Sequence, residues 1–166
     1  MRTTTWLTDA RIGQREERPG TWLLNLQVVL AAARALRFAA RHATDHCGAF
    51  GDALVLAALV GNDMQLAFQD FMGHPAVIER GRTLDGRLYR RHTLTLDAVA
   101  GADQDLLASA RLVATDFFNA FGSAEVRHVT SDGRVRVRYF PGEQNALRKF
   151  AEERGVEMTE ESVPGE

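Results

Sequence analysis

The predicted fold depends most on residues 103–140, which read DQDLLASARLVATDFFNAFGSAEVRHVTSDGRVRVRYF. Leu106, Ala110, Val113, Phe117 and Phe121 recur at helical spacing, so the first half predicts an amphipathic helix over 103–121 with its apolar stripe in the core. Gly122 is a typical helix stop. The Asp132-Gly133 pair that follows, between alternating residues, predicts a two-residue hairpin turn within 125–140.

The predicted hairpin gathers arginines on one of its faces. Outward pairing from Asp132-Gly133 places Val126, His128, Thr130, Val135, Val137 and Tyr139 on one face, and Arg127, Val129, Arg134, Arg136 and Arg138 on the other. Arg127 and Arg138 are then directly opposite, which is unfavourable unless an anion lies between them. We therefore consider Arg127, Arg134, Arg136 and Arg138 as an anion-binding or nucleic-acid-binding face, against the alternative of a solvated face neutralised by nearby acids.

Outside this region the chain alternates helical and strand patterns. Thr21 is a plausible N-cap for a helix reaching Cys47, with Gly48 as its stop. The run 53–60 is apolar throughout and predicts a buried strand, and 65–71 predicts a second strand after a turn at 61–63. Residues 77–98 predict a hairpin or strand pair divided at 84–86, and 143–154 predict a short helix that ends at Gly155.

These elements predict one α+β domain over residues 21–155, with an antiparallel sheet and two long helices, 21–47 and 103–121, packed on one face. The sheet is expected to combine the strands between Ala53 and Val99 with the 125–140 hairpin. Residues 1–20 are interpreted as an N-terminal arm, and residues 156–166 as an acidic disordered tail.

Composition limits the function classes. The 166 residues are 45% hydrophobic and 25% charged with a formal net charge of −2, which is typical of a globular domain without a global field for nucleic acid or membrane. The single cysteine, Cys47, cannot form an internal disulfide, and the first residues do not resemble a secretory leader, so we expect a cytoplasmic protein. Arginine far outnumbers the one lysine, Lys149, a bias that a GC-rich genome also produces.

A metal site is the main catalytic alternative. His42 and His46 lie four residues apart on one predicted helix face, and HATDH is similar to the inverted zinc-peptidase motif His-x-x-Glu-His with aspartate replacing glutamate. The sequence offers no clear third ligand. Two histidines in a last helical turn also complement the helix dipole, so we predict no cofactor and keep a metal-dependent hydrolase as the weaker alternative.

The aromatic, acidic and hydroxyl residues indicate no further catalytic or binding site. Phe117, Phe118 and Phe121 could line an apolar pocket, but their helical spacing favours the core. The serines lack a nucleophile-elbow context, and the aspartates have no defined spacing. Arg80, Arg82, Arg87, Arg90 and Arg91 form a second basic cluster with the same two readings as the hairpin arginines.

Several segments occur in an order that resembles a known protein region: GDALV at 51–55, RHTLTLD at 91–97, DLLASARL at 105–112, FFNAFG at 117–122 and the Asp132-Gly133 hairpin. The chain resembles, over about residues 21–140, the C-terminal accessory region of actinobacterial proteins that begin with a Schlafen-like AlbA domain, a module associated with DNA binding or nucleotide handling. The AlbA domain itself is not recognisable here. The resemblance carries over no functional residue and implies an accessory role.

The sequence therefore predicts a non-enzymatic regulatory or protein-interaction domain of a cytoplasmic actinobacterial protein, with a separately encoded protein or a second copy of the chain as partner. The alternative is a nucleic-acid-binding module that uses Arg127, Arg134, Arg136 and Arg138. No membrane partner is expected, because the longest apolar stretch, 22–33, is interrupted by polar residues.

Overall fold

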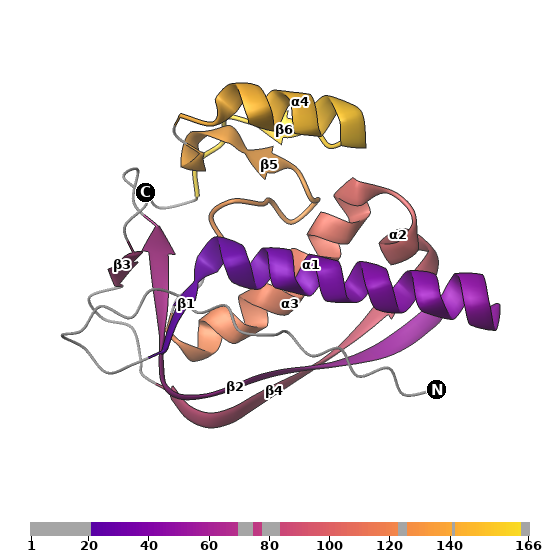
Figure 1. Cartoon of the computed structure of the whole chain (residues 1–166), viewed down its shortest axis with the longest axis horizontal. Helices are drawn as coiled ribbons and strands as arrows, with labels where there is room; N and C mark the ends of the chain where they lie inside the picture. Colours follow the sequence, from indigo (N-terminus) through magenta and orange to yellow (C-terminus); the bar gives the residue numbers. More distant parts are fainter. Residues whose placement is uncertain (1–20, 70–74, 78–83, 123–125, 141, 164–166) are drawn as a thin grey trace.

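A computed structural model describes residues 21–69, 75–77, 84–122, 126–140 and 142–163. The expected N-terminal arm, 1–20, lies outside the described residues. Two long helices pack on a mixed sheet that has an antiparallel part, which confirms the predicted α+β class (Figure 1). No helix in the described part of the chain is long and apolar enough to cross a membrane.

The main sheet is built around one long strand. Its members are β1 (Thr21–Leu24), β2 (Asp52–Gln69), β3 (Pro75–Val77) and β4 (Leu84–Thr95). Met64 of β2 pairs with Thr21 of β1 and also with Leu84 of β4, so these two strands lie on opposite edges of β2. β1 is parallel to β2, whereas β3 and β4 are antiparallel to it.

Two strand predictions need correction. The expected turn at 61–63 is a register shift between Gly61 and Met64 inside β2, where Asp63 has φ 48°. Such a bulge absorbs turn-forming residues without ending the strand, so the two predicted strands are one. The expected division at 84–86 is also wrong, because β4 begins at Leu84, includes these residues and continues into the helix α2 (Leu96–Ala100). Residues 78–83 of the predicted first strand lie outside the described residues.

The helices agree better with their local signals. α3 (Asp103–Ala120) and α4 (Gln144–Arg154) match their predictions, and Gly122 (φ 82°) and Gly155 (φ 62°) have the left-handed backbone expected after each. α1 (Asn25–Arg41) begins later than predicted, because 21–24 pair with β2 as β1, so Thr21 is not an N-cap. A π-helical turn, His42–His46, follows α1 before Gly48.

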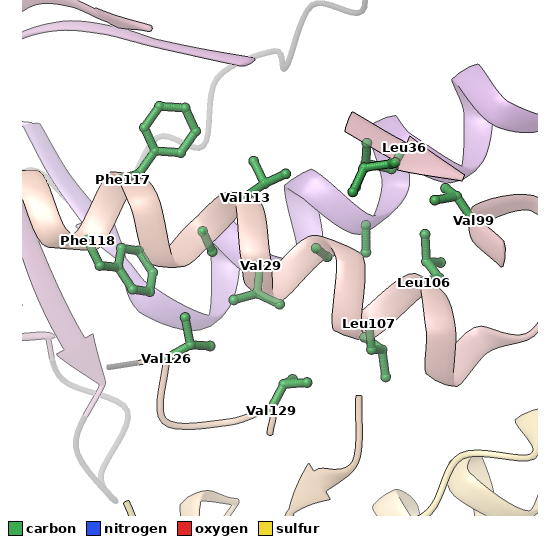
Figure 2. Close-up of a cluster of buried hydrophobic side chains, with 14 of the residues drawn as sticks. Val29, Leu36, Val99, Leu106, Leu107, Val113, Phe117, Phe118, Val126 and Val129 are labelled. Carbon is green, nitrogen blue, oxygen red and sulfur yellow. The ribbon is translucent and has the colours of Figure 1, made fainter. Parts of the chain in front are cut away.

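The core lies where α1 and α3 cross the inner face of β2 and β4. Figure 2 shows Val29 and Leu36 of α1 among Leu106, Val113 and Phe118 of α3. Phe117, Phe118 and Phe121 are 4%, 0% and 0% exposed, so the predicted core role of these rings is confirmed. Burial of apolar area between the two helices and the sheet is the main stabilising contribution to this arrangement.

The C-terminal part forms its own small layer, contrary to the prediction that 125–140 joins the main sheet. β5 (Val135–Arg136) pairs in parallel with β6 (Met158–Thr159), and 137–139 form a 3₁₀ turn. The expected disordered tail is wrong for 156–163, since Val156 and Val163 are buried. The Val163 amide also donates to the Tyr139 hydroxyl at 3.2 Å, which holds this segment against the domain.

Candidate interaction surface

The outer face of β2 is the most unusual surface of the described chain. Strand geometry points successive side chains to opposite faces, and between 53 and 60 the odd-numbered residues face the helices and are half-buried. The even-numbered residues point away. Leu54, Leu56 and Val60 are 62%, 64% and 65% exposed, and with Ala58 they form what we call the apolar strip.

β4 presents a different outer surface beside this strip. The register places Thr93 opposite Leu54, Arg91 opposite Leu56, Tyr89 opposite Ala58 and Arg87 opposite Val60. We call Arg87, Tyr89, Arg91 and Thr93 the polar strip. All four are exposed. An outward row of this composition is ordinary for a solvated antiparallel sheet, so the apolar strip is the departure from the usual pattern.

The polar strip contains no ion pair among the described residues. Neither Arg87 nor Arg91 forms an ion pair with a described residue. The acid at the start of β2, Asp52, accepts a hydrogen bond of 3.0 Å from the Thr95 hydroxyl. Phe50, two residues before β2, is 84% exposed and adds apolar surface near the same end of the strand.

The predicted strand over 53–60 is thus present, but its inner face is only half-buried and its outer face is exposed, so the predicted burial is wrong for the outer face. No described element packs on the outer side of β2 and β4 (Figure 1). Sequence reasoning missed the apolar strip because β2 is apolar on both faces. The signal that could have found it is in β4, whose alternation of Arg87, Tyr89 and Arg91 with apolar residues is typical of a sheet with one solvated face.

The predicted arginine face is not assembled. Thr130 donates its amide to the Arg134 carbonyl and Val129 bridges Val135, so the turn contains three residues rather than two. The pairing is therefore shifted by one position, and the Arg136 amide donates to the His128 carbonyl instead of Arg127 lying opposite Arg138. When the pairing shifts by one residue, the side chains of one strand move to the opposite face of the hairpin relative to those of its partner strand.

Each hairpin arginine has a separate environment. Arg136 is 5% exposed, and its Nη1 donates to the carbonyls of Val126 at 3.0 Å and Arg127 at 3.3 Å. Arg134 Nε lies 2.8 Å from a carboxylate oxygen of Asp132 and 3.2 Å from one of Glu157. Arg127 is half-buried, and Arg138 is exposed with its guanidinium 5.5 Å from the centre of the Tyr139 ring.

The acids around this turn are engaged as well. A hydrogen bond from the Thr130 hydroxyl is the main cause that lowers the pKa of Asp132, and the Arg134 charge acts in the same direction. Asp132 is therefore ionised at neutral pH and compensates Arg134. Arg134 and Arg136 consequently serve intramolecular contacts, and the buried Arg136 cannot belong to the predicted anion-binding face.

The two candidate metal ligands lie close together on the π-helical turn. The ring centres of His42 and His46 are 5.1 Å apart, and His42 also stacks on Phe38 at 6.2 Å. Within the described ranges, no three His, Cys, Asp or Glu side chains gather to hold a metal ion. The Asp45 carboxylate accepts a hydrogen bond from the neighbouring Thr44 hydroxyl at 3.1 Å. The described ligand set is therefore short of a closed zinc shell.

Two buried histidines join elements of the fold. His128 Nδ1 lies 3.3 Å from Asn25 Oδ1, and its ring makes edge contacts with Tyr139 and Phe140. Burial, followed by repulsion from Arg127, lowers the pKa of His128 to about 4, so the ring is neutral at pH 7. His92 Nε2 lies 3.6 Å from Asp116 Oδ2 and links β4 to α3. Sequence reasoning assigned no role to Asn25, His92 or His128, because their partners are distant along the chain.

Comparison with protein-family models, with curated proteins and with solved structures found no match to this chain.

Proposed function

We propose that this chain is a non-enzymatic protein-interaction domain, and that the outer face of β2 and β4 is its binding surface. The observation that carries the proposal is the apolar strip, in which three large aliphatic side chains on one strand are each more than 60% exposed. A contiguous apolar patch on a folded domain is typical of an interaction site. Fully burying a Val or Leu side chain that starts exposed contributes about 1.5–3 kcal/mol, from which the entropic cost of association is subtracted.

The surroundings of the strip support binding rather than catalysis. The exposed residues beside it are Arg87, Tyr89 and Arg91, and Tyr and Arg are enriched where proteins bind proteins. These charges at the rim of an apolar centre would steer and orient a partner, while the aliphatic side chains would supply most of the affinity.

A photo-activatable leucine analogue at position 56 tests this proposal in living cells. Leu56 is 64% exposed in the strip, and Leu112 of α3, 48% exposed and outside the sheet, is the matched control position. We expect irradiation to link position 56 to another polypeptide in much higher yield than position 112. Equal yields at the two positions would overturn the proposal.

A second candidate function is single-stranded nucleic-acid binding at the polar strip. Arg87 and Arg91 flank the exposed Tyr89 on one face of β4 without ion pairs to described residues, and such cations around an aromatic ring can hold phosphates and stack a base. Fluorescence anisotropy of a labelled oligonucleotide tests it. Binding that weakens with salt and disappears in Tyr89→Ala would support this function, and no binding at low salt would remove it.

A further inference from the structure

The apolar strip lies along a sheet edge. β4 pairs with β2 from Asp52 to Met64 on one edge, whereas β1 pairs with the opposite edge only from Met64 to Ala67. Between Asp52 and Gly61, therefore, no described strand occupies that second edge. Such an edge leaves a row of backbone N–H and C=O groups able to pair with another strand.

This edge lacks the features that prevent edge pairing. Residues 53–60 read ALVLAALV, with no charge and no proline, and the register irregularity begins only at Gly61. Proteins usually protect an exposed edge with lysine, proline, a bulge or an inward-pointing charge. Here the acids Asp52 and Asp63 lie at the two ends of the apolar segment and leave its middle unprotected.

The inner face of the same segment is also incompletely covered. Val55, Ala57 and Leu59 point toward the helices but remain only half-buried. β2 therefore has exposed apolar area on both of its faces next to the open edge. A neighbouring strand paired with this edge would cover part of the outer row and part of the inner row of β2 side chains at the same time. A ligand bound to the outer face would cover only the outer row.

We propose that a second copy of this chain pairs with β2 through this edge, antiparallel, about a two-fold axis at Ala57. The pairing rests on the proposed function, because it uses the strand that carries the apolar strip. It joins two β2/β4 ribbons into a continuous four-stranded sheet with both β2 strands in the middle. A two-fold axis brings the same patch of each copy into contact. Because no free patch then remains, the assembly stops at a dimer.

The sequence of the segment is compatible with itself in this register. Leu54 lies opposite Val60 of the second copy, Val55 opposite Leu59, and Leu56 opposite Ala58, so every cross-strand pair is apolar. The Asp52 carboxylate is next to the uncharged Asn62 of the second copy. Arg87 and Arg91 stay on the outer strands β4, so their charges do not oppose one another across the new contact.

A charge-swap series on the full chain tests this pairing by analytical ultracentrifugation over a range of protein concentrations. Leu54 and Val60 are exposed, so their replacement leaves the core unchanged. In Leu54→Lys/Val60→Lys, two lysines meet at each of two symmetric positions, and the dimer Kd should rise at least about tenfold. Leu54→Lys/Val60→Glu places opposite charges at those positions, and should restore association. Leu112→Lys is the control for adding a lysine elsewhere.

The expected result is a wild-type dimer, weakened in the lysine pair, recovered in the lysine–glutamate pair and unchanged in Leu112→Lys. A wild-type monomer at every concentration would overturn the inference, and so would a dimer that the lysine pair leaves intact or that the glutamate fails to restore. Circular dichroism checks that every variant is folded. The two proposals can fail separately, because a wild type that stays monomeric but still cross-links at position 56 to a different protein retains the interaction function and excludes self-pairing.

Discussion

His128 makes the stability of this domain depend on pH in a way that can be calculated. The ring is 8% exposed, and its Nδ1 lies 3.3 Å from Asn25 Oδ1, so the neutral ring donates to the amide oxygen. Burial is the main cause, and the Arg127 charge the second, that lowers its pKa from 6.5 to about 4. Protonation would place an uncompensated charge between α1 and the C-terminal layer.

The sign follows from proton binding in the two states. In the unfolded chain His128 titrates near 6.5, whereas in the folded chain it titrates near 4, so between these values the unfolded state binds more protons. The contribution of His128 to the free energy of unfolding is therefore fully present above pH 6.5, and it is lost as the pH falls toward 4. One pKa unit corresponds to about 1.4 kcal/mol, so the full loss is roughly 3 kcal/mol.

Urea denaturation at several pH values between 6.5 and 4 measures this loss, with His128→Gln as the test variant and His46→Gln as the control. The Gln side chain cannot be protonated in this range, so His128→Gln lacks the titrating group. His46 is an exposed histidine, and its replacement controls for the loss of a histidine elsewhere in the chain. Because carboxylates also titrate at low pH, the quantity of interest is the difference between variant and wild type. We expect His46→Gln to follow the wild type, and His128→Gln to lose about 3 kcal/mol less on acidification.

Identical pH dependence in wild type and His128→Gln would refute this reasoning. A strongly destabilised His128→Gln would still leave a decisive measurement, since NMR can follow the His128 ring in the folded wild type. A midpoint close to 6.5 in that titration would show that the ring is accessible to water, and the proposed burial of a neutral imidazole would be wrong.

Phe121→Ala, Gly133→Ala and Arg136→Glu test packing and turn geometry by chemical denaturation, and Leu112→Ala and Gly155→Ala are the controls for the first two. Phe121→Ala removes a ring that is 0% exposed and should cost about 3–5 kcal/mol, while Leu112→Ala, at a half-exposed position, should cost less than about 1 kcal/mol; a similar small loss in both would place the ring in solvent. Gly133→Ala should destabilise more than Gly155→Ala. Both have positive φ, which costs about 1–2 kcal/mol, but only at Gly133 would a Cβ lie 2.0 Å from a backbone oxygen, that of Gln104; equal losses would disprove the close approach. Arg136→Glu should cost roughly 3 kcal/mol or more, because it removes the donor from the buried Val126 carbonyl and the part-buried Arg127 carbonyl and introduces a buried acid; unchanged stability would mean that the side chain points outward.

Local signals were sufficient for the helices in the second half of the chain. The apolar period in 103–120 and the glycine after it specify α3 and its end, and Gly155 does the same for α4. Their information lies within four residues along the chain, the distance over which helical hydrogen bonds and caps act. The α+β class follows from the same periodicities, as does the burial of Phe117 and Phe121.

Tertiary structure decided everything that depends on residues far apart. Thr21–Leu24 became a strand because Met64–Ala67 were available to pair with them, which overrode the helical pattern of the segment. The shift of the hairpin by one residue buried Arg136 and separated the arginines that the sequence had placed together.

The candidate site shows the same division. The sequence by itself determined that 53–60 are apolar, that 87–93 alternate and that both form strands. Only the packing of α1 and α3 on one side of the sheet, with no described element on the other, decided that Leu54, Leu56 and Val60 face outward. A strand with two apolar faces is compatible with burial on either, and which face is covered depends on how the whole chain fills its layers.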